Sequence, residues 1–289
     1  MPAERLYLRL PDDPVDPPES TLPAGTMVAH EVRPELACLV EMVATHRETI
    51  PTGERWTERI LPDGAARLIV DLGDTPTVRG DPSARVRVVG PSASPTVLEL
   101  EGHLEGLSFT LGPGAVPALF GVSTRALTDR AVSLDELWGP GSEARVQEAL
   151  FASRTPWARS DALQSMLVRR TTPNRPEATA ERGVALMRSS GGRLSVADVA
   201  SALGVGERRL QQLFVRDVGL TPRAFRRLAR LQACIRSLRS ATRPRWSQMA
   251  VDMGFYDQAH LANEFRSLSG LTPSAFLERR PSGSSKTRE

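Results

Sequence analysis

The chain has 289 residues, of which 40% are hydrophobic and 25% are charged. These proportions are typical of soluble globular proteins and leave room for two domains, each with a core of its own. No run of about 18 apolar residues occurs and the N-terminus, Met-Pro-Ala-Glu-Arg, lacks the apolar core of a signal peptide, so we expect a cytoplasmic protein with no membrane partner.

The formal net charge of +3 hides an uneven distribution along the chain. Residues 1–179 carry 18 Arg against 25 Asp and Glu, a net charge of −7, whereas residues 180–289 carry 19 Arg and Lys against 9 acidic residues, a net charge of +10. A localised basic surface is typical of proteins that bind a polyanion, because each phosphate contact releases condensed counterions. We therefore expect the C-terminal region to bind nucleic acid.

Short β-rich runs dominate the first 112 residues, separated by turns of Gly, Pro and Asp. They are residues 67–72, 85–89, 96–100 and 107–111. This pattern predicts a small antiparallel sandwich or barrel. One helix is expected to interrupt it early, from about Pro34 to Thr45, because apolar residues recur there on one helical face.

From Pro113 onward the pattern becomes helical, and residues 171–179, with two prolines and few apolar residues, are typical of a linker. The expected helices are residues 115–119, 133–137, 142–151 and 157–169. The predicted fold class is therefore α+β with two domains. A β-rich sandwich or barrel with helices covers residues 1–170, an all-α domain covers residues 180–280, and residues 281–289 form a disordered tail.

One pattern occurs twice in the last third of the chain. The two copies are Ala200-x3-Gly204-x5-Leu210-x3-Phe214-x4-Gly219-Leu220-Thr221-Pro222-x2-Phe225 and Ala250-x3-Gly254-x6-Leu261-x3-Phe265-x4-Gly270-Leu271-Thr272-Pro273-x2-Phe276. Two copies are too few for a solenoid. Each copy instead predicts a helix-turn-helix, in which a glycine ends a short helix and the Leu and Phe positions form the apolar face of a second helix.

Helix start signals support this interpretation. Ser195 and Asp198 have the spacing of a capping box, and Thr221-Pro222 provides an N-cap followed by proline for a long connecting helix. In the second copy, Ser247 is expected to cap the first helix and Asp257 the second.

Polar residues are expected to face outward on the second helix of each copy. They are Glu207, Arg208, Arg209, Gln211 and Gln212 in the first copy and Gln258, Ala259, His260, Ala262, Asn263 and Arg266 in the second. The second helix of a helix-turn-helix enters the major groove, where Gln and Asn can pair with adenine, Arg with guanine, and Ala can meet a thymine methyl group. An exposed polar residue alone indicates only a solvated face, but the duplication within a basic region favours base reading.

The second copy carries a longer motif from Gly254 to Pro273. It runs Gly-Phe-Tyr-Asp-Gln-Ala-His-Leu-Ala-Asn-Glu-Phe-Arg-Ser-Leu-Ser-Gly-Leu-Thr-Pro. This motif resembles the signature of AraC/XylS-type transcription regulators, Gly-Phe-x-Asp-x-x-His-(Phe/Leu)-x-x-x-Phe-(Arg/Lys)-x-x-x-Gly-x-(Thr/Ser)-Pro. The resemblance covers about residues 180–280. It implies a seven-helix domain in which a long helix of about residues 222–240 holds two recognition helices against successive major grooves, about 34 Å apart.

The same resemblance implies roles for individual residues. Base contacts fall on Arg208, Gln211, Gln212, Gln258, Ala259, Ala262 and Asn263. Phosphate contacts are expected at Arg209, Ser247, Arg266 and the helix starts near Thr221 and Thr272. Many family members have Arg where this chain has Gln212 and Asn263, so its operator is expected to differ from theirs. The implied partners are double-stranded DNA and RNA polymerase, with no cofactor.

The N-terminal half resembles the β-rich, cupin-like domain found on a subset of these regulators. The matching elements are Leu61-Pro62-Asp63-Gly64, Gly106 to Ala115 and Leu134-Asp135-Glu136-Leu137-Trp138-Gly139. This resemblance implies a module that senses a small-molecule effector or forms a homodimer, but it identifies no ligand. His103, Trp56 and Arg67 are candidates to line a pocket, with ordinary packing or surface positions as the alternative.

A DNA-binding regulator is the leading hypothesis, and two other classes stay open. An enzyme with a DNA-binding tail, as in alkylation-repair methyltransferases, needs an activated Cys, whereas Cys38 and Cys234 are expected to be buried thiols in apolar helical surroundings. His residues at 30, 46, 103 and 260 lack the paired spacing of a zinc site, so no metal and no catalytic residue is expected. A protein-interaction scaffold would leave the basic recognition faces unexplained.

Overall fold

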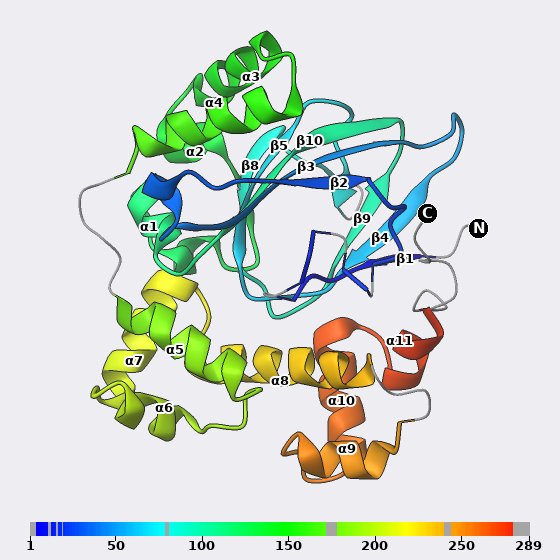
Figure 1. Cartoon of the computed structure of the whole chain (residues 1–289), viewed down its shortest axis with the longest axis vertical. Coiled ribbons are helices and arrows are strands. Elements are labelled where there is room, and N and C mark those ends of the chain that lie inside the picture. The colour runs from blue at the N-terminus through cyan, green and yellow to red at the C-terminus, as the bar shows by residue number, and fades with distance from the viewer. Residues whose placement is uncertain are drawn as a thin grey trace.

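The computed structural model describes residues 4–10, 13–15, 17, 18, 20–78, 81–171, 178–239 and 244–279. These residues form a β-rich part, residues 4–171, and a helical part, residues 178–279, that lie against each other (Figure 1). The combination of β sheets with a separate set of helices confirms the α+β fold class expected from the sequence.

Two sheets make up the β-rich part. The six-stranded sheet contains, in spatial order, β11 (Ala131–Ser133), β8 (Val86–Val89), β5 (Ala66–Asp71), β10 (His103–Leu111), β3 (Val40–Thr49) and β2 (Met27–His30). The five-stranded sheet contains β1 (Arg5–Tyr7), β4 (Trp56–Ile60), β9 (Thr96–Leu100), β6 (Thr77–Val78) and β7 (Asp81–Pro82). Neighbouring strands are antiparallel except β1 and β4, which are parallel. The four predicted strands are confirmed as β5, β8, β9 and β10.

The predicted helix from Pro34 to Thr45 is wrong. Only a short 3-10 helix, η1 (Pro34–Leu36), forms there, and the chain then enters β3. β3 pairs with β10 from Thr49 opposite His103 to Val40 opposite Leu111. The apolar residues of this segment suit either period, and pairing with the neighbouring strand favours the extended form of its β-branched residues.

Four α-helices complete the β-rich part, at the positions predicted. They are α1 (Ala115–Phe120), α2 (Leu134–Trp138), α3 (Ser142–Ala152) and α4 (Pro156–Val168). α3 and α4 lie side by side near the edge of the sheets away from the helical part (Figure 1). Val146 and Leu150 of α3 and Leu163 and Leu167 of α4 are buried in the same cluster as Phe109 of β10. This packing holds the two helices on the six-stranded sheet.

Seven α-helices form the described part of the chain from residue 178 to residue 279. They are α5 (Ala178–Ser189), α6 (Val196–Ala202), α7 (Glu207–Leu213), α8 (Pro222–Leu238), α9 (Trp246–Asp252), α10 (Gln258–Ser269) and α11 (Pro273–Arg279). α8 runs along the helical part and connects the α6–α7 pair with the α9–α10 pair (Figure 1). Residues 172–177 of the predicted linker and the predicted tail, 281–289, lie outside the described residues.

The helical part shares its core with the N-terminal segment. Leu6 of β1, the following Leu8 and Leu10, and Leu61 after β4 are buried in the cluster formed by side chains of α5–α11. Two hydrogen bonds of 2.6 and 2.7 Å from the Arg239 guanidinium to the Asp13 carboxylate add to this contact. Leu6 therefore belongs to the five-stranded sheet by its backbone and to the helical core by its side chain.

Leu8→Ala is expected to lower the free energy of unfolding by about 2–5 kcal/mol, because it leaves a cavity in the helical core. Val28→Ala is the matched control, since Val28 is 52% exposed on β2; we expect it to change the free energy of unfolding by less than about 0.5 kcal/mol. Urea unfolding of both variants measures the difference. Equal effects would show that Leu8 contributes no more than a surface residue.

Candidate nucleic-acid interface

The first helix-turn-helix consists of α6 and α7. The Ser195 hydroxyl accepts a hydrogen bond from the Asp198 N–H at 3.1 Å, and the Asp198 carboxylate accepts one from the Ser195 N–H at 3.0 Å. This confirms the predicted capping box. Gly204, with a φ of 68°, takes the left-handed conformation after α6, and α7 begins three residues later.

The second helix-turn-helix, α9 and α10, reproduces this turn. The Val205 N–H donates to the Ala200 carbonyl at 3.0 Å, and the equivalent Phe255 N–H donates to the Ala250 carbonyl at 2.8 Å. Gly254, with a φ of 72°, occupies the position of Gly204. The sequence repeat is therefore also a repeat of backbone geometry.

Side-chain caps start most of the helices as predicted. Thr221 accepts from the Ala224 N–H at 3.1 Å, Thr272 from the Ala275 N–H at 3.2 Å, and Asp257 from the His260 N–H at 2.7 Å. The cap predicted at Ser247 is wrong. α9 begins at Trp246, which places Ser247 inside the first helical turn, and the N-cap residue Arg245 makes no side-chain capping hydrogen bond.

A pair of packed phenylalanine rings connects each recognition helix with the helix that follows it. The rings of Phe214 and Phe225 lie 5.9 Å apart at an interplanar angle of 73°, and those of Phe265 and Phe276 lie 5.4 Å apart at 66°. Both pairs have the edge-to-face geometry that aromatic rings favour. The buried Leu and Phe positions fix which face of α7 and α10 stays outside.

Glu264 on α10 is a further contact that sequence reasoning missed. Its carboxylate accepts a hydrogen bond from Arg227 Nε of α8 at 2.9 Å, and its side chain is only 17% exposed. The signal was present in the sequence, since Glu264 lies three residues after Leu261 and four before Leu268, on the buried face. This ion pair joins α10 to α8.

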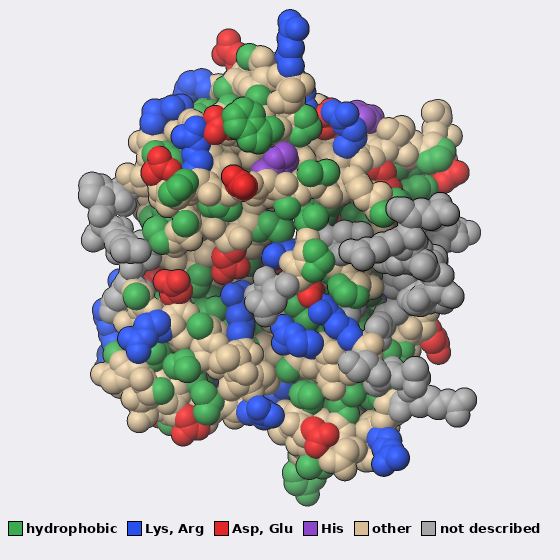
Figure 2. Space-filling model, viewed as in Figure 1, with side chains coloured by type: hydrophobic (Ala, Val, Ile, Leu, Met, Phe, Trp, Pro, Cys, Tyr) green, Lys and Arg blue, Asp and Glu red, His purple; other side chains and the backbone are tan. Residues whose placement is uncertain are grey.

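Most of the predicted DNA-contacting residues are exposed. Among the predicted base contacts, the exposed residues are Arg208, Gln211, Gln212, Gln258, Ala259 and Asn263, and Ala262 is half-buried. Among the predicted phosphate contacts, the exposed residues are Arg209, Ser247, Arg266 and Thr272, and Thr221 is half-buried. The base-contact residues thus gather on α7 and α10. Figure 2 shows Arg side chains on the helical part, in the lower half of the view.

The two cysteines differ from each other in exposure. Cys234 is buried in α8 as predicted, and burial raises the pKa of its thiol to about 12. Cys38 is exposed, so its predicted burial is wrong. The reason is that the expected helix is replaced by η1 and a turn, which place Cys38 outside the core. Burial of Cys38 is therefore no argument against an enzyme.

One candidate ligand site lies in the β-rich part. An open cavity of about 430 Å³ is lined by Leu72, Gly73, Asp74, Arg85, His103, Gln147 and Phe151. His103 is therefore placed at a cavity. The other two candidates have structural contacts instead, since Trp56 stacks with the Arg5 guanidinium 5.1 Å from its ring centroid and Arg67 forms an ion pair with Asp63.

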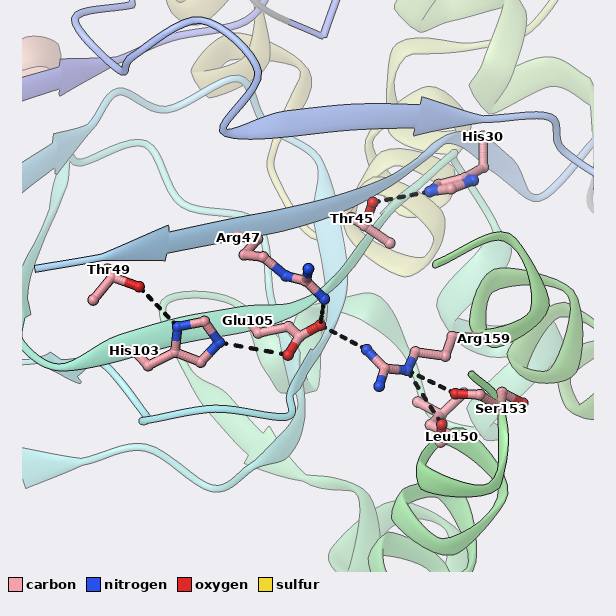
Figure 3. A network of polar contacts seen from close by, with 9 residues as sticks. All are labelled: His30, Thr45, Arg47, Thr49, His103, Glu105, Leu150, Ser153 and Arg159. Carbon is pink, nitrogen blue, oxygen red and sulfur yellow. Dashed lines mark hydrogen bonds and ion pairs between the residues drawn. The ribbon is translucent and has the colours of Figure 1, made fainter. Parts of the chain in front are cut away.

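A polar network lies beside this cavity and joins α4 to β10 (Figure 3). The Glu105 carboxylate accepts hydrogen bonds from Arg47 and, at 2.7 Å, from Arg159 Nη1, and His103 Nε2 lies 3.6 Å from it. Desolvation alone would raise the pKa of Glu105, but the two guanidiniums outweigh it and lower the pKa to about 2. Glu105 therefore stays ionised at neutral pH and holds α4 in place beside the cavity.

The described residues contain neither a helix that could span a membrane nor a cluster that could bind a metal. None of their helices combines the length and apolar character needed to cross a membrane. No group of three or more His, Cys, Asp or Glu side chains in the same part of the chain is arranged to hold a metal ion.

Gly204→Ala is expected to lower the free energy of unfolding by about 1–2 kcal/mol, because a Cβ disfavours the left-handed conformation. Gly206→Ala is the matched control. Gly206 has a φ of −74°, and like Gly204 it has open space where a Cβ would lie. Gly206 is the N-cap of α7, where Ala is less favourable than Gly, but Ala also reduces the conformational entropy of the unfolded chain. Because these effects oppose each other, we expect the control to stay within about 0.5 kcal/mol of the unmodified chain. Urea unfolding tests both, and equal losses would contradict the assigned turn.

Two families match this chain. Residues 199–279 match a family described as a helix-turn-helix domain, and residues 30–133 match a domain of unknown function, DUF6597. Among curated proteins, the uncharacterized HTH-type transcriptional regulator YidL of Escherichia coli is 33% identical over 86 residues. That alignment spans 30% of this chain and 29% of YidL.

Solved structures of similar proteins include regulators from two bacteria. The transcriptional regulator with an AraC-type DNA-binding domain from Chromobacterium violaceum is 27% identical, with a TM-score of 0.33, over 36% of this chain and 95% of its own. ToxT from Vibrio cholerae is 12% identical, with a TM-score of 0.44, over 83% of this chain and 99% of its own. With the doubled turn geometry and the motif of residues 254–273, the family match assigns residues 199–279 to a helix-turn-helix domain of the AraC type, and a β-rich part precedes this domain.

Proposed function

We propose that this protein is a sequence-specific DNA-binding transcription regulator in which α7 and α10 enter successive major grooves. The observation that carries the proposal is the doubled helix-turn-helix, in which each second helix exposes amide or guanidinium side chains. It lies in the part of the chain with a net charge of +10. Residues 180–280 are assigned to DNA binding on this basis.

The two recognition helices differ in chemistry, so their half-sites are expected to differ. α7 presents Arg208 and Arg209, which favour guanine and phosphate, whereas α10 presents the uncharged Gln258 and Asn263, which favour adenine. An operator built as a direct repeat of one sequence would not suit both helices. The exposed Arg266 is assigned to phosphate.

The β-rich part is proposed to sense a small-molecule effector, to form a homodimer, or both, and RNA polymerase is proposed as the protein partner of the regulator. The open cavity at His103 supports the first role, because it combines the apolar Leu72 and Phe151 with the charged Asp74 and Arg85. A few charged groups among apolar ones suit a small polar molecule with an apolar portion.

Asn263→Ala is expected to cost about 1–3 kcal/mol of binding free energy at particular base pairs, because a paired amide is lost. Arg266→Ala is expected to weaken binding to all sequences and to reduce the salt slope by about one. DNA duplexes selected from a random library by the full chain, followed by titrations on single-base variants at several salt concentrations, measure both effects.

Gln248→Ala is the matched control for Asn263→Ala, since it removes an exposed amide from α9 instead of α10. It is expected to leave base preference unchanged. If selection returned no preferred sequence, the proposed function would fail. If Asn263→Ala weakened every sequence equally, base reading by this residue would be wrong.

The effector role has its own test. Mass spectrometry of the protein purified under native conditions is expected to detect a bound small molecule. Gln147→Trp should exclude it by filling the cavity, whereas Gln248→Trp, on α9, should not. Retention of the same molecule by both variants would place its site elsewhere.

A further inference from the structure

The two recognition helices end differently although their sequences have the same spacing. α7 passes at Phe214 into a π-helix, η3 (Phe214–Val218), whereas α10 stays α-helical to Ser269. The Gly219 N–H accordingly donates five residues back, to Phe214, and the Gly270 N–H four residues back, to Arg266, each at 2.9 Å. Equal spacing means that chain length does not explain the difference. The surroundings of the two ends differ as well.

The end of the first recognition helix is held by hydrogen bonds from the β-rich part. The Asp217 carbonyl accepts from the Gly114 N–H at 2.9 Å and from the Thr124 hydroxyl at 3.2 Å. The Gly219 carbonyl accepts from the Thr128 hydroxyl at 2.7 Å. Both threonines lie at η2 (Thr124–Leu127) or directly after it. Within the described residues, no hydrogen bond from the β-rich part reaches Leu268 or Gly270, the equivalent positions at the end of α10.

These contacts are close and largely shielded from water. Asp217 is 5% exposed and Thr124 is 3% exposed. Gly219 has a φ of 81°, and a Cβ there would lie 2.7 Å from Pro91 Cγ and 2.9 Å from Thr124 Cγ2. The cavity that remains between the two parts beside Thr124 and Asp217 measures about 20 Å³, the size for one water molecule. The β-rich part therefore touches this helix end directly.

We propose that Thr124 and Thr128 are positioning residues for DNA reading by α7. Their hydroxyl groups satisfy two buried carbonyls and so hold the π-helical end of α7 against the β-rich part. A π-helical turn spans one residue more than an α-helical turn. If the π-helical end became α-helical, α7 would rotate by one residue, about 100°, relative to the chain that follows it. Through these hydrogen bonds the β-rich part acts on the half-site of α7. At the end of α10 the side chains of Arg59 and Pro95 lie beside Gly270, but within the described residues the β-rich part donates no hydrogen bond to Leu268 or Gly270. This inference rests on the proposed function, because it needs α7 to read DNA.

The test replaces both threonines in the full chain with valine, which keeps the shape and removes the hydroxyl. Duplexes from the selection are then made with one of the two half-sites scrambled. The affinity for each such duplex reports on DNA binding by one recognition helix alone. For Thr124→Val with Thr128→Val, the affinity for the duplex that keeps only the α7 half-site is expected to fall about threefold to tenfold, the effect of one net hydrogen bond. The affinity for the duplex that keeps only the α10 half-site is expected to change less than about twofold.

Two matched controls accompany this variant. Thr124→Ser with Thr128→Ser keeps both hydroxyls and is expected to bind like the unmodified chain. Thr45→Val removes a hydroxyl that lies 2.9 Å from His30 Nε2 in the β2–β3 pair, and is expected to leave both half-sites unchanged. An equal loss at both half-sites, or no loss at either, would overturn the proposal.

Hydrogen exchange of the free protein tests the same contacts without DNA. In the double valine variant, amides of residues 207–219 are expected to exchange about threefold to tenfold faster, while those of residues 258–270 stay unchanged. Unchanged exchange in residues 207–219 would overturn the proposal. If selection returns no preferred DNA, the proposed function fails and reading by α7 fails with it, whereas the exchange result still decides whether the threonines hold α7.

Discussion

The edge-to-face packing of Phe214 on Phe225 and of Phe265 on Phe276 is the interaction on which the arrangement of the helical part depends. Each pair joins a recognition helix to the helix that begins after the Leu-Thr-Pro turn. With the neighbouring leucines it decides which face of α7 and α10 is buried. The exposed polar faces, and so the proposed base contacts, follow from this packing, because a helix buries one stripe and leaves the other to solvent.

The contact between the two parts is a second constraint. Leu6, Leu8 and Leu10, from the N-terminal segment, are buried in the core of the helical part. The Thr124 and Thr128 hydroxyls hydrogen-bond to the end of the first recognition helix. The helical part is therefore packed against the β-rich part and shares buried contacts with it. This arrangement offers a physical route by which events in the β-rich part reach α7, namely the direct hydrogen bonds from Thr124 and Thr128.

Elements with local signals were predictable, and elements that depend on distant neighbours were not. The capping residues Ser195, Thr221 and Asp257 act within one helical turn, so their motifs identified real caps. The helix expected from Pro34 to Thr45 failed because pairing of β3 with β10, about 60 residues later in the chain, outweighs a local helical period. The same error led to the wrong burial of Cys38. Glu264 lies on the buried face that the helical period indicates, but its partner, Arg227, lies on another helix and has no local signal.

By itself, the sequence determined the doubled helix-turn-helix, the Leu and Phe positions of its core and the residues exposed on α7 and α10. These features rest on helical periodicity, turn glycines and caps, which act between residues close together in the chain. Only the tertiary structure decided that α7 ends in a π-helix while α10 does not, and that the N-terminal leucines complete the helical core. The hydrogen bonds that hold the end of α7 and the apolar contacts of the N-terminal leucines join segments 90 or more residues apart, for which the sequence carries no local signal.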